Sequence, residues 1–121
     1  TTIALVNSGF ITETPDIAIP LEIAKKLKIW PLEKGEIIEL STGGGEVEAF
    51  MVREVVVLES VDRPDKRFKV NVIINNYIDE VLLSDYVAGE LGIVILDLKK
   101  GLWRFSDEEK IRETEAPQYW L

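Results

Sequence analysis

The residues of this chain that could do chemistry are few, because the sequence contains no histidine and no cysteine. This excludes Ser-His-Asp triads, thiolate nucleophiles and metal sites built from imidazole or thiolate groups. Hydrolysis would have to rest on carboxylates, or on Lys and Ser. One polar tripeptide is notable, because Asn7-Ser8-Gly9 directly follows the apolar, strand-like run 2–6. Three turn-forming residues after a strand predict a sharp polar loop.

The aspartates do not form a metal-binding pattern. Asp16, Asp79, Asp85 and Asp97 lack the spacing of a calcium-binding loop. We interpret these carboxylates as solvated or capping groups. We therefore expect no metal and no cofactor.

The elements that position the tripeptide are mostly short strands. Strand patterns cover residues 36–41 and 46–52, which the glycines at 43–45 join into a hairpin, and residues 55–58, 68–74 and 81–83. A second hairpin turns at 99–101. Helical spacing covers only 19–27 and the segment from Ser84 to Gly92. This pattern predicts an all-β barrel or sandwich with two short helices.

The order of four motifs resembles the retropepsin-like aspartic proteases, and more closely their small archaeal and bacterial members. The motifs are a strand ending in Leu-Val-Asn-Ser-Gly-Phe (5–10), a glycine-rich hairpin tip (41–45), an apolar pair before Ser (82–84) and the helix that follows (85–92). The resemblance covers about residues 2–105, and we treat residues 1–105 as one domain. It implies an acid-protease β-barrel that is complete only as a homodimer.

The resemblance also implies site residues. The family's catalytic Asp falls at Asn7, the Ser8 hydroxyl would bond across the dimer, and Gly9 would give substrate room. Each position also has a structural interpretation, as turn, hairpin or core residue. The implied catalytic positions are Asn7, Ser8 and Gly9, and the implied substrate-binding positions are Phe10, Thr42, Gly43, Gly44, Gly45, Met51 and Ile78.

Asn7 is the main departure from the family. In that family two aspartates, one per subunit, share a proton and activate water, and an amide can do neither job. We therefore expect an aspartic-type endopeptidase fold that is inactive as written. Either an Asp-to-Asn change silences a protease, which we favour from the intact surroundings, or the chain is a natural non-catalytic descendant. A second departure is Ser84 at a family glycine, where helix capping is a sufficient reason for Ser.

The composition of the chain limits the kinds of molecule that we expect it to bind. With 22 acidic and 14 basic residues the net charge is −8, which opposes nucleic-acid binding. No apolar run reaches the roughly 18 residues of a membrane span, and no signal-like segment precedes the first strand pattern, so we expect a cytoplasmic location and no membrane partner. Many Ile, Glu and Lys with few thermolabile residues hint at a thermophilic source.

The acidic segment 106–121 follows the predicted domain. It opens with the helix-capping pattern Ser106 to Glu109 and ends on the apolar residues 119–121, so it is either a dimer-interface segment or a frayed tail.

The expected partners are a second copy and a peptide or unfolded protein substrate. The first alternative function is a non-catalytic peptide-binding or regulatory module on the same fold. The second alternative, ranked below it, is a structural dimerisation domain.

Overall fold

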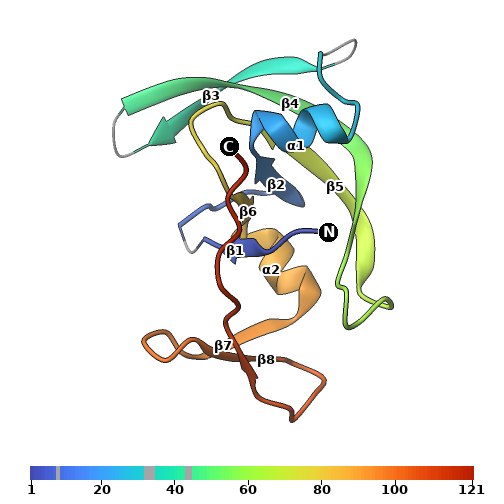
Figure 1. Ribbon diagram of the computed structural model, residues 1–121, viewed down its shortest axis with the longest axis vertical. Coiled ribbons are helices and arrows are strands. Elements are labelled where there is room, and N and C mark those ends of the chain that lie inside the picture. Colours follow the sequence, from blue (N-terminus) through green and yellow to red (C-terminus); the bar gives the residue numbers. More distant parts are fainter. Residues whose placement is uncertain (8, 32–34, 43–44) are drawn as a thin grey trace.

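The computed structural model describes residues 1–7, 9–31, 35–42 and 45–121. Most of its regular structure is β, with two short helices, which confirms the β-rich fold expected from the sequence. A six-stranded sheet has the order β1-β6-β2-β5-β4-β3, and a smaller sheet has the order β7-β8-β9 (Figure 1). The strands are β1 (Ala4–Val6), β2 (Asp16–Ile19), β3 (Glu36–Thr42), β4 (Gly45–Glu59), β5 (Arg67–Ile74), β6 (Val81–Leu83), β7 (Ile93–Asp97), β8 (Leu102–Phe105) and β9 (Arg112–Glu113).

The six-stranded sheet is open. β1 and β3 lie at its two edges and do not pair with each other, so the described residues form no closed barrel, and that part of the fold prediction is wrong. Closure requires the first and last strands to meet along their length. Here β1 is only three residues long and pairs with β6, while β3 pairs with β4.

β6 is the strand that organises the N-terminal part of the chain. It pairs in parallel with β1 and antiparallel with β2, so that Leu82 lies opposite both Leu5 and Ala18. The consecutive strands β1 and β2 therefore flank β6 instead of touching each other. The connection between them, which carries Asn7, has to cross the end of β6.

β2 is a central strand that the sequence pattern did not predict. All four of its residues are buried, so it lacks the alternation of polar and apolar residues that marks a half-exposed strand. It also lies between Pro15 and Pro20, which are signals for turns and helix starts. β5 pairs with it in parallel on one side and β6 pairs with it on the other.

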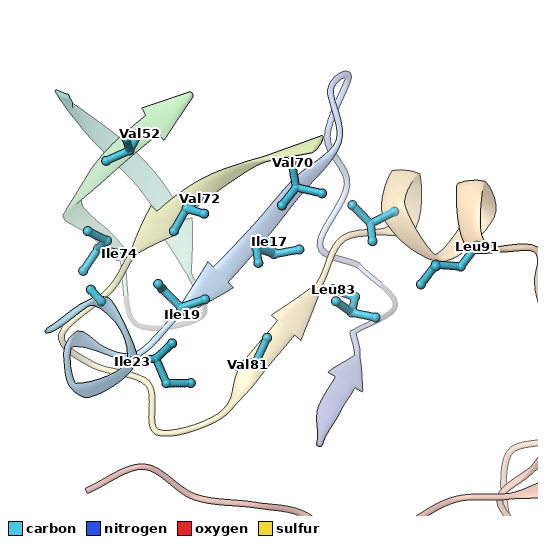
Figure 2. Packing of buried hydrophobic residues seen from close by; sticks show 12 residues of the cluster. Ile17, Ile19, Ile23, Val52, Val70, Val72, Ile74, Val81, Leu83 and Leu91 are labelled. Atoms are coloured by element: carbon cyan, nitrogen blue, oxygen red, sulfur yellow. The ribbon is translucent and has the colours of Figure 1, made fainter. Parts of the chain in front are cut away.

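The main core lies between this sheet and both helices (Figure 2). Alternate residues of each strand point to the helical side, for example Ile17 and Ile19 of β2. Helix α1 (Leu21–Lys26) contributes Ile23 and Ala24, and helix α2 (Asp85–Leu91) contributes Val87 and Leu91. The intervening strand residues point to the opposite face and form a second, smaller apolar cluster.

A bulge bends β4 below the hairpin. The predicted strands 46–52 and 55–58 are one strand, and its pairing with β5 shifts register between Val52 and Val56. In the bulge Glu54 has a φ of +52°, a conformation that is strained for a residue with a side chain. The Glu54 N–H donates to Asn71 Oδ1 at 3.1 Å. This hydrogen bond holds the bend.

Asp16 completes the same network from β2. Its Oδ1 accepts hydrogen bonds from Asn71 Nδ2 at 2.9 Å and from the Thr14 hydroxyl at 2.8 Å. Asp16 is only 4% exposed, so its interpretation as a solvated group is wrong. By contrast, Asp97 Oδ1 accepts from the Lys100 N–H and caps a turn, as predicted.

Asn71→Ala is expected to lower the free energy of unfolding by about 3 kcal/mol, because it leaves the buried Asp16 carboxylate and the Glu54 N–H short of partners. Urea unfolding followed by circular dichroism measures this change. Asn76→Ala is the matched control, since Asn76 is exposed and should cost less than about 0.5 kcal/mol. Equal effects at the two positions would contradict the assigned role of the network.

A cluster of ion pairs attaches the small sheet to the loop between β4 and β5. Arg63 donates to Asp107 (2.7 Å), Glu108 (2.7 Å) and Asp65 (2.9 Å), and it also lies over the Phe105 ring. The capping pattern at Ser106 predicted a helix start, but the segment forms a turn. These side chains are used in ion pairs to Arg63, and no helix follows.

The cationic side chains of the cluster share one aromatic surface. Lys66 and Arg112 also lie over the Phe105 ring, at 5.0 Å each. Arg112 bonds Asp62 at 2.6 Å and Glu108 at 3.1 Å. Both cations are largely buried, at 14% and 12% exposure, which makes these pairs less screened than ordinary surface pairs.

Acid is expected to weaken this attachment. Hydrogen bonds from Arg63 lower the pKa of Asp107 to about 2 and lower the pKa values of Asp65 and Glu108. Carboxyl groups with lowered pKa values stabilise the fold above their unfolded pKa of about 4, and this contribution is lost as the pH falls toward 2. Urea unfolding at pH 7, 4 and 2.5 should therefore show a steep loss of stability below pH 4.

Asp107→Asn should flatten this part of the pH profile, because it removes the carboxyl group with the most perturbed titration. Glu115→Gln is the control, since Glu115 is exposed and makes no ion pair among the described residues. A profile for Asp107→Asn as steep as that of the parent would contradict the assignment.

The C-terminal segment returns to the first strand (Figure 1). Gln118 Oε1 accepts from the Ile3 N–H at 3.1 Å, and the Trp120 N–H donates to the Asp79 carbonyl at 2.7 Å. The Trp120 indole donates to the Thr2 hydroxyl and packs against the main core. The segment is thus packed on its own chain and is not frayed.

Candidate functional site

The loop after β1 is fixed by backbone hydrogen bonds to β6 and α2. The Asn7 N–H donates to the Leu83 carbonyl at 3.3 Å, and the Phe10 N–H donates to the Asn7 carbonyl at 3.0 Å. The Asp85 N–H at the start of α2 donates to the Phe10 carbonyl at 2.9 Å. Asn7 and Phe10 are thereby tied to the point where β6 passes into α2.

Glycine is required in this loop for its backbone conformation. Gly9 has a φ of +103°, which residues with a Cβ rarely adopt. A Cβ at this position would meet no atom within 4 Å. The space in front of Gly9 is therefore open, which suits a loop that another chain approaches closely.

Asn7 presents an amide from this fixed loop. It is partly buried, and among the described residues its side chain has no hydrogen-bond partner. An amide can donate and accept, so it can bind a peptide N–H or carbonyl. It cannot take a proton from water at ordinary pH. Ser8, the second predicted catalytic residue, lies outside the described residues.

Ser84 precedes Asp85, the residue of α2 that binds the loop, and it is the N-cap of that helix. Its hydroxyl accepts from the Val87 N–H at 3.3 Å, which confirms the predicted helix cap, and its own N–H donates to the Asp16 carbonyl at 3.3 Å. The side chain is completely buried. Gly92 ends the helix with a φ of +77°, as the sequence predicted. The helix start beneath the loop is thereby tied to the centre of the sheet.

The predicted glycine-rich hairpin is present as β3 and β4. Pairing runs from Glu36–Met51 to Thr42–Gly45. Gly45 has a φ of +109°. Gly43 and Gly44 lie outside the described residues, and of Thr42 only the backbone is described. Their predicted role over a substrate therefore stays a prediction.

The three predicted pocket residues lie in one apolar cluster. Met51 belongs to its buried part, with Ala18, Ala49 and Ile73, and Phe10 and Ile78 pack against it half-buried. This cluster is on the face of the sheet opposite both helices. The structure thus brings Phe10, Met51 and Ile78 together although they come from three separate segments.

Three further residues of this cluster were not predicted from the sequence as site residues. Leu82, Ile38 and Leu40 also pack against it. A usable signal was present, because residues two apart on a strand share a face. Leu82 lies between the core residues Val81 and Leu83 and must therefore point to the opposite side.

The arrangement is suited to binding rather than to bond cleavage by itself. It combines a fixed loop with a free amide, an apolar surface and a hairpin of the same sheet. Among the described residues no group of three or more Asp or Glu side chains could hold a metal ion.

No protein-family model, curated protein or solved structure matches this chain. In the part of the chain that the structure describes, no helix is long and apolar enough to cross a membrane.

Proposed function

We propose that this chain is one half of a homodimeric, retropepsin-like aspartic protease fold that binds extended peptide and, because of Asn7, does not cut it. The observation that carries the proposal is the loop of Asn7, which hydrogen bonds to Leu83 and Asp85 fix at the junction of β6 and α2. The amide of Asn7 is without a partner among the described residues. Phe10, three residues further along, packs against an apolar cluster that could contact the side chains of a bound peptide.

Hydrolysis on this scaffold would need two carboxylates. A pair of close aspartates holds one proton between them, so that one acts as base on water and the other as acid toward the carbonyl. Each chain supplies one such position, at Asn7. The site is therefore complete only with a second copy, and the amide leaves it able to bind peptide without activating water.

The surface proposed for the second copy is the free edge of β7. Within the described residues this strand pairs only with β8, so its other edge has unpaired backbone groups. Ile95 and Leu96 are each 46% exposed there, and Leu98 is 82% exposed. Exposed apolar edge strands pair readily with another strand. A two-fold axis beside β7 would join the two small sheets into one.

Ile95→Lys is expected to convert the dimer into a monomer, because a charge on an edge strand opposes pairing with another chain. Sedimentation velocity measures the change. Val61→Lys is the matched control, since Val61 is 69% exposed in the loop between β4 and β5 and should leave the dimer intact. Dimerisation of Ile95→Lys at the parent affinity would refute the proposed surface.

Asn7→Asp is expected to create proteolytic activity at acid pH. Restoring the shared proton pair should raise cleavage of an unfolded protein by about 100-fold or more over the parent between pH 3 and pH 6. Asn76→Asp adds the same carboxyl group at an exposed position and should remain inactive. Cleavage is followed by mass spectrometry of the products.

A dimeric Asn7→Asp protein without activity would favour the second candidate, a non-catalytic peptide-binding module. The observation that favours this candidate is the amide at Asn7 itself. A statine-type peptide inhibitor titrated into the parent protein separates the two peptide-binding functions from a purely structural dimer. Absence of binding to both the parent and the Asn7→Asp protein would refute the peptide-binding proposal.

A further inference from the structure

A small pocket opens on the helical side of the sheet, away from the loop of Asn7. Its volume is about 180 Å³, and its walls include Trp30, Phe50 and Tyr77, with Glu48 and Asn76 as polar groups. Phe50 belongs to the main core, whereas its neighbour Met51 belongs to the opposite cluster. Successive residues of a strand point to opposite faces, so this pocket is separate from the proposed peptide site.

The aromatic walls are held in place. The Trp30 and Phe50 rings lie 5.2 Å apart at 58°, and both pack against the main core. The Tyr77 N–H donates to the side chain of the buried Asn75 at 2.8 Å, and the Asn75 N–H donates to the Ile19 carbonyl. Tyr77 itself is 78% exposed. An anchored backbone therefore presents this ring at the rim.

The acidic group of the pocket has no paired cation in the part of the chain that the structure describes. Among the described residues Glu48 makes no ion pair, and its direct cross-strand neighbour on β3 is Glu39, which makes none either. Like charges opposite each other destabilise a sheet. The same hairpin does pair a carboxylate at its base, where Glu36 bonds Arg53. A cation from another molecule would relieve the repulsion at Glu48.

We propose that this pocket binds an arginine side chain of a peptide or protein partner. Its volume is below that of drug-sized ligand sites and fits one long side chain. Guanidinium groups stack on aromatic faces and bond carboxylates in the same plane. Trp30 and Tyr77 supply such faces and Glu48 supplies the carboxylate. The net charge of −8 also favours a basic partner.

The test uses the parent protein and the peptide acetyl-Gly-Arg-Gly-amide, with acetyl-Gly-Gln-Gly-amide as the uncharged probe. Two-dimensional ¹H–¹⁵N NMR should show saturable shifts of the Trp30 indole and Tyr77 amide signals with the Arg peptide at millimolar concentrations. The Gln peptide should bind at least about tenfold more weakly, because it lacks the charge.

Glu48→Gln should weaken binding of the Arg peptide by about five- to tenfold without unfolding an exposed position. Glu90→Gln is the matched control, since Glu90 is exposed on α2 and makes no ion pair among the described residues. Equal binding of the two peptides, an unchanged affinity of Glu48→Gln, shifts confined to other residues, or no shift at all would each overturn the proposal. None of these outcomes depends on Asn7 or on dimerisation, so the test is independent of the proposed peptide site.

Discussion

The fold depends on the position of one strand of three residues. Because β6 pairs with both β1 and β2, the chain between β1 and β2 must cross the carboxyl end of β6. That crossing creates a short loop with both ends hydrogen-bonded, and α2 begins directly beneath it. A loop fixed in this way can present a side chain at a constant position. The hydrogen bonds of Asn7 and Phe10 therefore follow from strand order, while Gly9 supplies the positive φ that the loop also needs.

The buried polar network extends this constraint to the hairpin. Asp16 begins β2, and through Asn71 it reaches the bulge at Glu54, from which β3 and β4 extend. The hairpin is thus attached to β2 by hydrogen bonds in low-dielectric surroundings, where unpaired polar groups are costly. The Asp16 carbonyl of the same strand accepts from the Ser84 N–H, which precedes the residue that binds the loop. The small sheet is attached by ion pairs around Arg63 and not by a buried hydrogen-bond network. These pairs lie nearer the surface, and their strength depends on the charge of the carboxylates.

Local features were predictable from the sequence. Ser84 and Gly92 correctly bounded α2, and the glycines at 43–45 correctly located the hairpin, because caps and turns depend on neighbouring residues. The predictions that failed concern residues whose contacts lie far away in the sequence. β2 lacks alternation because both faces of the sheet are covered there, with Ile17 and Ile19 in the main core and Ala18 in the opposite cluster. Asp16 looked solvated because its partner Asn71 lies 55 residues away. The pattern at Ser106 predicted a helix, but its acidic side chains are bound by Arg63 from another loop.

The return of the C-terminal segment has a consequence for how the chain folds. The Trp120 indole donates a hydrogen bond to the Thr2 hydroxyl across a sequence separation of 118 residues. β1 has no strand to pair with until β6, which begins at Val81, has been synthesised. Contacts between distant residues close large loops of disordered chain and slow folding. During synthesis β1 would therefore remain without its strand neighbour until β6 had emerged, and without its contact to Trp120 until residue 120 had emerged. The central strands β4 and β5, adjacent in sequence and paired over nearly the whole length of β5, are the natural place for folding to begin.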